Sequence, residues 1–274
     1  MLFKSVLTFA CVLFSAVAFG ASAADTPSGT APGAVKAAVP WEQAFAAFAD
    51  EDASHPHPAG GVLFVGSSSI RLWSDLQDQF KDLPVVINRG FGGSELADCV
   101  KNLNRLVIRY RPSTVLVYAG DNDLAAGTTP QEVLHRFTAF VEGVRRELPE
   151  TRIAYISIKP SPLRIGLLPQ IKQTNALIRD YTEGLEKVAF IDVYTPMLDS
   201  AGKPRTELFR ADSLHLNADG YALWKRVIVV LAGPAMNILF PVLLYFSVFI
   251  GDTRLVCNNG KATFSQNFHH HGGS

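Results

Sequence analysis

The stretch GVLFVGSSSI, residues 61–70, carries an almost uniformly apolar run that ends in a glycine and three serines. Further apolar runs rich in β-branched and aromatic residues follow at 85–90, 113–120, 152–158 and 188–194. Segments with helical periodicity separate these runs, at 70–82, 94–109, 130–149 and 168–186. Apolar strands that alternate with helices are typical of a parallel sheet covered on both faces. We therefore predict an α/β fold, a three-layer α/β/α sandwich around a five-stranded parallel sheet in flavodoxin-like order.

The predicted domain occupies residues 59–232, with a last helix over about 217–231. Residues 25–58 precede it and contain a linker rich in Pro, Gly and small residues, then a short helix in WEQAFAAFADED. Residues 1–24 hold Lys4, an apolar run and an Ala-x-Ala pattern, which predict a secretory signal and therefore an exported protein. The alternative is an N-terminal membrane anchor, for which the apolar run is short.

Composition narrows the classes of function. The chain has 25 basic and 25 acidic residues, so it offers no basic field for a polyanion, and we exclude nucleic acid as a partner. At 48% hydrophobic residues it has ample material for a core. Cys99 and Cys257 remain after signal removal, too few for a disulfide framework, and neither lies in a metal-ligand spacing. Cys99 falls in a predicted amphipathic helix, where we expect it to be buried.

Polar residues follow the predicted strands where the carboxyl ends of a parallel sheet meet. Ser67-Ser68-Ser69 follows the first strand and is either a helix cap or the source of a nucleophile. The glycines of residues 90–94 follow the second, and they either form a tight turn or present N–H groups to a ligand. Gly120-Asp121-Asn122-Asp123 follows the third strand and suits a turn as well as a site. Asp212 precedes His215 by three residues, close enough to orient its imidazole.

Together these four groups predict acyl transfer. That reaction needs a hydroxyl nucleophile, a base, a group that orients the base, and donors for the developing oxyanion. Two further features stay open. Arg89 either contacts a polar substrate head group or pairs with Asp121 or Asp123. Residues 159–162, Lys-Pro-Ser-Pro, follow the fourth strand and are placed to line the cleft.

These four groups of residues resemble the motifs of the SGNH, or GDSL-type, hydrolase family, and the resemblance covers about residues 61–226. Within the family, FVGSSSIRLW, INRGFGGS and YAGDNDLAAG resemble the platelet-activating-factor acetylhydrolase-like and lysophospholipase-like branch. The resemblance implies Ser68 as nucleophile, His215 as base and Asp212 as its orienting acid. It implies Ser68, Gly93 and Asn122 as oxyanion donors, with no metal and no organic cofactor.

One residue departs from the family pattern. Ser67 stands where the family has Asp, so the choice among three adjacent serines rests on alignment, and Ser68 is favoured. In an ordinary α/β-hydrolase the triad residues also occur along the chain in the order Ser, acid, His. The nucleophile elbow of that fold, however, needs Gly two residues after the serine. Here that position is Ile70.

The C-terminal region needs a separate interpretation. Residues 227–251 form a long uncharged apolar stretch, sufficient in length for a membrane helix. LAGPAMNILFPVLLYFSVFIG also resembles a membrane segment of site-2 type intramembrane metalloproteases, although the chain has no His-Glu-x-x-His motif. Residues 233–274 are therefore either a membrane anchor with a disordered tail or a segment foreign to the esterase. Lys225 and Arg226 lie on the exported side of such a span, against the positive-inside bias.

We therefore expect an exported serine esterase of the lipase, acetylesterase or lysophospholipase type, acting on an acylated sugar or lipid. Two alternatives belong to other classes. One is a catalytically silent module that binds carbohydrate or lipid in the same cleft. The other is a membrane-associated subunit that depends on residues 227–251. The sequence indicates neither the acyl and alcohol specificity nor the oligomeric state.

Overall fold

Five parallel strands form the centre of the fold. The computed structural model describes residues 41–232, 254–258 and 261–265 of the 274-residue chain. The sheet runs in the order β2-β1-β3-β4-β5, with every neighbouring pair parallel. The predicted α/β class, strand number and flavodoxin-like order are therefore confirmed. The strands are β1 (Val62–Gly66), β2 (Val86–Gly90), β3 (Thr114–Tyr118), β4 (Arg152–Ile156) and β5 (Val188–Ile191).

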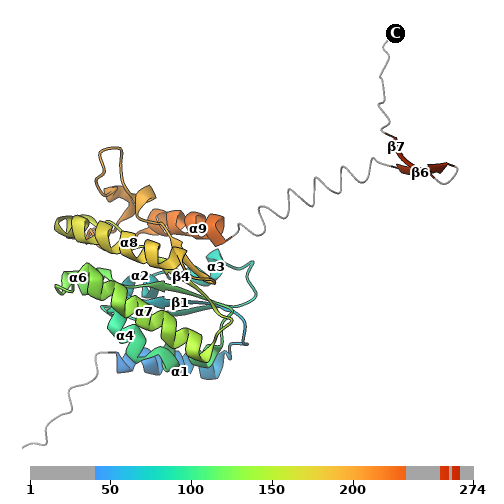
Figure 1. Ribbon diagram of the computed structural model, residues 1–274. Coiled ribbons are helices and arrows are strands. Elements are labelled where there is room, and N and C mark those ends of the chain that lie inside the picture. Colours follow the sequence, from blue (N-terminus) through green and yellow to red (C-terminus); the bar gives the residue numbers. More distant parts are fainter. Residues whose placement is uncertain (1–40, 233–253, 259–260, 266–274) are drawn as a thin grey trace, which may run out of the picture. The chain divides into compact units, whose positions relative to one another are not determined.

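Helices and short 3₁₀ turns make the connections between strands (Figure 1). The α-helices are α1 (Glu42–Ser54), α2 (Ser68–Arg71), α3 (Leu76–Gln79), α4 (Leu96–Lys101), α5 (Leu103–Leu106), α6 (Asp121–Ala125), α7 (Pro130–Glu147), α8 (Leu168–Glu183) and α9 (Ala218–Ala232). The 3₁₀ turns are η1 (Ile108–Tyr110), η2 (Pro162–Leu167), η3 (Thr195–Met197) and η4 (Thr206–Leu208).

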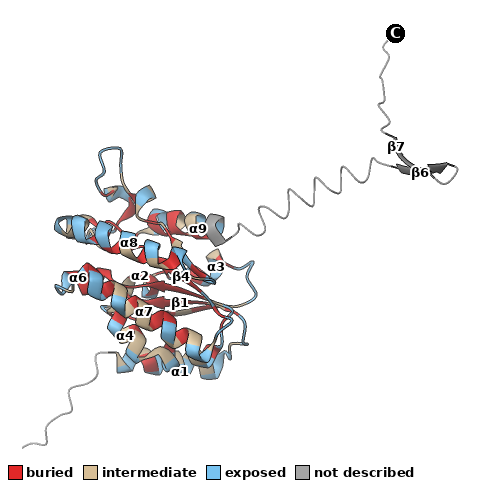
Figure 2. Ribbon diagram, in the orientation of Figure 1, coloured by how far each residue is buried: buried red, intermediate tan, exposed pale blue. Residues whose placement is uncertain are grey.

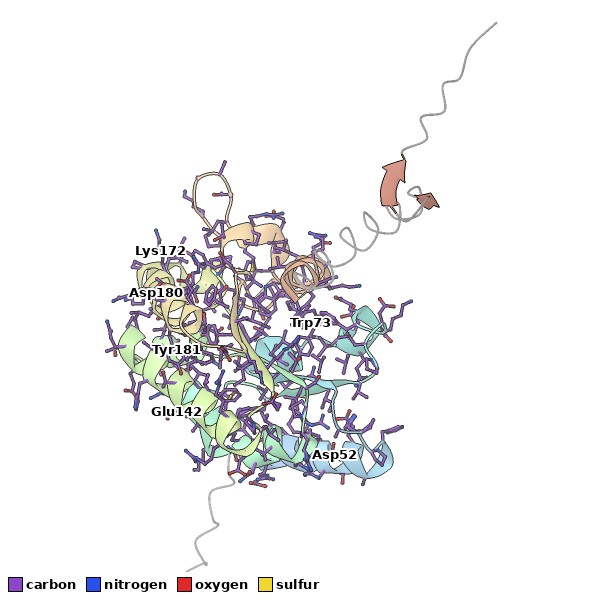
Figure 3. The ribbon with its side chains drawn as sticks, turned by 45° about the vertical axis from the view of Figure 1, so that its right-hand side comes forward. Asp52, Trp73, Glu142, Lys172, Asp180 and Tyr181 are labelled. Carbon is purple, nitrogen blue, oxygen red and sulfur yellow. The ribbon has the colours of Figure 1, made fainter. Side chains whose placement is uncertain are left out.

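The two faces of the sheet build two separate hydrophobic cores. In β1, Leu63 and Val65 pack toward α1, α4, α5, α7 and α8, whereas Phe64 packs toward α2, α3 and α9. On the second face Trp73 (labelled in Figure 3) stacks on Tyr221 with ring centroids 5.0 Å apart. Because helices cover both faces, β1 to β4 are buried along almost their whole length (Figure 2), which explains their nearly uniform apolar composition, whereas only the two end residues of the edge strand β5 are buried.

Two predicted helices are broken into shorter pieces. The segment 70–82 divides into α2 and α3. Asp75 stands at the N-cap position of the second piece, and its carboxylate accepts a hydrogen bond from the side-chain amide of Gln79 at 2.8 Å. The segment 94–109 divides at Asn102, whose side-chain amide donates to the Asp98 carbonyl at 2.9 Å. The bond from the Asn102 side chain to the backbone competes with a continuous helix. Cys99 lies in α4 and is fully buried with a free thiol, as predicted.

Helix α1 belongs structurally to the α/β domain, although the sequence analysis grouped it with the linker. Its Phe45 is buried in the first core. Its Glu51 and Asp52 form ion pairs with Arg89 of β2. The apolar contact and the buried charges both tie α1 to the sheet, so the compact part of the chain begins before residue 59.

The C-terminal region is described only in part. Residues 254–258 and 261–265 form β6 and β7, an antiparallel pair, which differs from the disordered tail expected there. Most of the candidate membrane segment 227–251 lies outside the described residues. Among the described helices, none is both long enough and apolar enough to cross a membrane.

Candidate active site

The turn between β1 and α2 presents Ser68 at the carboxyl edge of the sheet. Gly66 ends β1 with φ +138°, and a Cβ there would lie 1.8 Å from the carbonyl oxygen of Tyr118. Only glycine fits this contact between β1 and β3. The Ser67 N–H donates to the same carbonyl at 3.0 Å, and the chain then turns directly into α2 with Ser68 as its first residue.

A second turn brings an acid and an imidazole together before α9. One carboxylate oxygen of Asp212 accepts hydrogen bonds from the N–H groups of Leu214 (3.0 Å) and His215 (2.9 Å). Its other oxygen lies 2.6 Å from Nδ1 of His215. Between them Ser213 adopts φ +56°, a left-handed conformation that closes the turn. The three-residue spacing thus produces a turn that holds the carboxylate against the ring.

The two turns meet at Ser68. Nε2 of His215 lies 2.9 Å from the Ser68 hydroxyl oxygen, although the two residues are 147 positions apart in the chain. With a proton on Nδ1 facing Asp212, Nε2 is free to accept the serine hydroxyl proton. The structure therefore brings Ser68, His215 and Asp212 into one hydrogen-bonded chain.

The other two serines of the turn have different surroundings. Ser67 is completely buried, and its hydroxyl has no hydrogen-bond partner among the described residues. Ser69 is also buried, and its hydroxyl accepts a hydrogen bond from Lys159 at 3.1 Å. Ser68 is partly exposed and faces His215. This geometry favours Ser68 among the three serines that the sequence left as candidates.

Asp212 is held in its ionised form. The N–H of His215, the ring of His215 and the N–H of Leu214 all donate hydrogen bonds to its carboxylate, and they lower the pKa of Asp212 well below its ordinary value. The side chain of Asp212 is 48% exposed, so burial opposes the shift only weakly. A charged carboxylate at Nδ1 stabilises the imidazolium that forms when His215 takes a proton.

The predicted oxyanion donors come from the next two strand ends. Gly93 follows β2 with φ +75°, and Asn122 lies in the first turn of α6, after β3. The Asn122 side-chain nitrogen donates to the carbonyl of Ser94 at 3.0 Å, which joins the two blocks. The glycine-rich stretch 90–94 also packs against α2, the helix that begins at Ser68. A Cβ on Gly90 would lie 2.2 Å from the backbone nitrogen of Arg71. Gly93, Asn122 and the Ser68 turn are thus parts of one rim.

Sequence reasoning missed a buried ionic cluster behind this rim. We call it the Lys159 cluster, and it comprises Lys159, Asp121, Tyr118 and Arg164. Nζ of Lys159 donates to Tyr118 at 3.0 Å and to Asp121 at 3.1 Å. The Arg164 guanidinium lies 3.1 Å from the same carboxylate oxygen of Asp121. Residues 159–162 were expected to line the cleft, but Lys159 is 1% exposed and faces the interior.

The structure contradicts both interpretations of Arg89 that the sequence offered. Arg89 neither reaches the site nor pairs with Asp121 or Asp123. Its fully buried guanidinium binds Glu51 at 2.9 Å, Asp52, and the hydroxyl of Tyr110 at 2.7 Å. The reason is strand alternation, because residue 89 of β2 points to the face that α1 covers.

The described residues contain no group of three or more His, Cys, Asp or Glu side chains placed to hold a metal ion. The rim itself presents a hydroxyl beside an imidazole, a fixed carboxylate, and amide groups on the next two loops.

Comparison with known proteins identifies the family of the chain. The model of the GDSL-like Lipase/Acylhydrolase family matches residues 59–223, more than half of the chain. This chain belongs to the GDSL-like lipase/acylhydrolase family. Members of this family are hydrolases that act on esters, and the four sequence blocks all lie within the matched range. No curated relative matches the chain.

Solved structures of GDSL-like and related enzymes share the fold. A GDSL-like lipase from Bacteroides thetaiotaomicron superposes with a TM-score of 0.61 at 22% identity, covering 70% of this chain and 98% of that chain. A protein from Streptococcus pneumonia whose name refers to platelet activating factor gives 0.60 at 22% identity, covering 68% and 90%. A family 3 carbohydrate esterase from Clostridium thermocellum gives 0.50 at 19% identity, covering 66% and 97%.

Proposed function

We propose that this protein is a serine esterase in which Ser68, His215 and Asp212 form the catalytic triad. One observation carries the proposal. The Ser68 hydroxyl lies 2.9 Å from Nε2 of His215, and Nδ1 of that ring lies 2.6 Å from the Asp212 carboxylate. A hydroxyl, a base and an ionised acid in one chain form the arrangement that activates serine as a nucleophile.

The reaction runs in two steps. Ser68 attacks the ester carbonyl while His215 takes its proton, and the imidazolium returns that proton to the departing alcohol. Water then attacks the acyl-enzyme with His215 again as base, releasing the acid and restoring the Ser68 hydroxyl. The N–H groups of Ser68 and Gly93 and the amide of Asn122 bind the oxyanion in both steps. The chain's own groups supply all of this chemistry.

The substrate we propose is a small ester with an acylated sugar or lipid as its alcohol part. The family is one of lipases and acylhydrolases, and a carbohydrate esterase is among the proteins that share the fold. An assay panel should therefore contain an aryl acetate, an acetylated oligosaccharide and a lysophospholipid. We also propose export, based on the signal pattern in residues 1–24, and N-terminal sequencing of protein recovered outside the cytoplasm tests it.

Labelling with a fluorophosphonate, followed by peptide mapping, tests the reaction class and the nucleophile together. We expect the label on Ser68, and loss of both labelling and ester hydrolysis in Ser68→Ala. Ser67→Ala is the matched control, because the Ser67 hydroxyl is buried and has no hydrogen-bond partner within the described part of the chain, and this variant should still label. A folded wild-type protein that neither labels nor hydrolyses any ester of the panel would contradict the proposal and favour a silent binding module.

A further inference from the structure

The segment after β4 connects both halves of the site. Its backbone is fixed at the start, where the side-chain amide of Asn175 bonds both the N–H (2.8 Å) and the carbonyl (2.9 Å) of Ile158. Further along, the N–H of Leu163 in η2 donates to the carbonyl of Ser213 at 3.0 Å, within the turn that carries Asp212 and His215. The next residue, Arg164, reaches the other half of the site.

Arg164 contacts the amide that we assign to the oxyanion hole. Nη2 of its guanidinium donates to Oδ1 of Asn122 at 2.8 Å. A guanidinium has only donors, so it binds the oxygen end of an amide and repels the nitrogen end. The nitrogen end of Asn122 is fixed separately, since Nδ2 donates to the Ser94 carbonyl at 3.0 Å. Two contacts of opposite polarity therefore determine which way the Asn122 amide points.

Asp121 holds the Arg164 guanidinium through an ion pair. Its carboxylate lies 3.1 Å from Nη1 of Arg164 and accepts hydrogen bonds from Lys159 and Tyr118, both at 3.1 Å. Burial raises the pKa of Asp121, but the charges of Lys159 and Arg164 outweigh burial and hold it below its usual value. Lys159 also donates to the hydroxyl of Ser69 at 3.1 Å, next to the proposed nucleophile. The same cluster thus supports the oxyanion amide and the nucleophile turn.

We propose that Arg164 is a positioning residue, which fixes the Asn122 amide with its nitrogen directed to the oxyanion and is itself held by Asp121. The inference rests on the proposed esterase function. One N–H of Asn122 binds Ser94, which leaves the second N–H for the substrate oxygen. Without Arg164 the amide keeps only the Ser94 contact of the two that distinguish its oxygen from its nitrogen, so the donor is less well preorganised.

Steady-state kinetics of Arg164→Met test this role. We expect kcat to fall about tenfold to a hundredfold, below the ~10²–10³ loss typical when an oxyanion donor is removed outright, with little change in KM. Arg164→Lys keeps the charge but lacks the planar fork that reaches Asn122 and Asp121 together, so it should recover only part of kcat. Arg179→Met is the matched control. Arg179 lies on α8 and pairs with Asp192, the residue after β5, at 3.1 Å, so this variant should leave kcat unchanged.

A double-mutant cycle separates positioning from a general structural effect. If Arg164 acts through Asn122, then adding Arg164→Met to Asn122→Ala should lower kcat no further. A full additional loss in the Asn122→Ala background would overturn the proposal. Ser68→Ala serves as the reference for the esterase itself, since residual turnover there would mean that the proposed function, and not the role of Arg164, has failed.

Nuclear magnetic resonance gives a readout that does not depend on turnover. The side-chain amide signals of Asn122 are identified by their absence in Asn122→Ala. In the wild-type protein we expect two well-separated proton signals, because one N–H is bonded to Ser94. Arg164→Met should move them toward the positions of a solvated amide, and Arg179→Met should not. Unchanged Asn122 signals in Arg164→Met would overturn the proposal whether or not the protein hydrolyses an ester.

Discussion

Two buried cations in this fold, Arg89 and Lys159, differ in how many carboxylates surround them. Arg89 faces two carboxylates, Glu51 and Asp52, whereas Lys159 shares the single carboxylate of Asp121 with Arg164. Burial lowers the pKa of Arg89, but its bond to Tyr110 and the two carboxylates outweigh burial and raise that pKa. For Lys159 burial prevails over Asp121 and the pKa is lowered.

The two arrangements also differ in what they touch. We call Arg89, Glu51, Asp52 and Tyr110 the Arg89 cluster, and its contacts join α1 to β2 on one face of the sheet. The Lys159 cluster contacts Ser69 and Asn122 at the rim where we propose that catalysis takes place. Its surplus of positive charge lies behind the point where we expect an oxyanion to form. Burial and pairing of charge are common to both clusters, so only contact with the reacting groups distinguishes a functional cluster from a structural one.

Asp121→Asn should have the largest effect. The substitution leaves the buried Lys159 close to the partly exposed Arg164 with no carboxylate between them. We expect a loss of about 3–5 kcal/mol in the free energy of unfolding, because removal of one partner leaves an uncompensated buried charge. The kcat should also fall, since Arg164 loses its anchor. Urea denaturation and initial rates at saturating substrate measure the two effects.

A second substitution sharpens this result. Adding Lys159→Met to Asp121→Asn removes one of the uncompensated charges and should restore part of the unfolding free energy. It should not restore kcat, because Arg164 still lacks its carboxylate. Full recovery of kcat in the double variant would mean that the Lys159 cluster serves stability alone, and it would remove the distinction from the Arg89 cluster.

Asn122→Ala should have the next largest effect, and on activity alone. Loss of one oxyanion donor costs about 10²–10³ in kcat, or roughly 2.7–4 kcal/mol of transition-state stabilisation. The unfolding free energy should change by only about 1 kcal/mol, the net contribution of a typical hydrogen bond such as that to Ser94. A wild-type kcat in this variant would mean that Asn122 is not an oxyanion donor. The Lys159 cluster would then have no role in activity through Asn122.

Arg89→Met should show the reverse pattern. The substitution removes the buried cation that ties α1 to β2, and we expect the protein to lose roughly 2–3 kcal/mol of stability. The loss should be smaller than for Asp121→Asn, because the Glu51 side chain is 39% exposed and can return to water. The kcat of the folded variant should equal that of wild type, measured well below its melting temperature. A fall in kcat would show that α1 affects the rim.

The sequence predicted the parts of the molecule that depend on local pattern. The apolar runs identified all five strands of the parallel sheet, and Gly66 with the serines after it marked the turn that presents Ser68. The three-residue spacing from Asp212 to His215 anticipated their contact, since two N–H groups within that turn fix the carboxylate. In each case neighbours in the chain determine the geometry.

The remaining features depend on contacts between distant segments. Lys159 meets Asp121 across 38 positions, and Arg164 meets Asn122 across 42, so no local spacing could reveal them. A strand-end position suggested exposure for Lys159, but the carboxylate of Asp121 and the hydroxyl of Tyr118 make its burial tolerable. For Arg89 a signal was present, because alternation along β2 places residues 87 and 89 on the same face, away from the Asn88 side chain.

The smallest expected effect is the change with pH in the contribution of Asp212 to the free energy of unfolding. Its pKa is lowered in the folded protein, so the stability that its carboxylate contributes is present above the unfolded value, about 3.9, and is lost only as the pH falls through the lower folded value. The effect is modest because the side chain is 48% exposed. The difference in unfolding free energy between wild type and Asp212→Asn should therefore not shrink between pH 8 and about pH 5. A decrease centred near pH 6 would mean that the Asp212 carboxylate takes up a proton in the working range. In that case Asp212 would resemble a buried, desolvated acid more than the ionised partner that the His215 turn is built to hold.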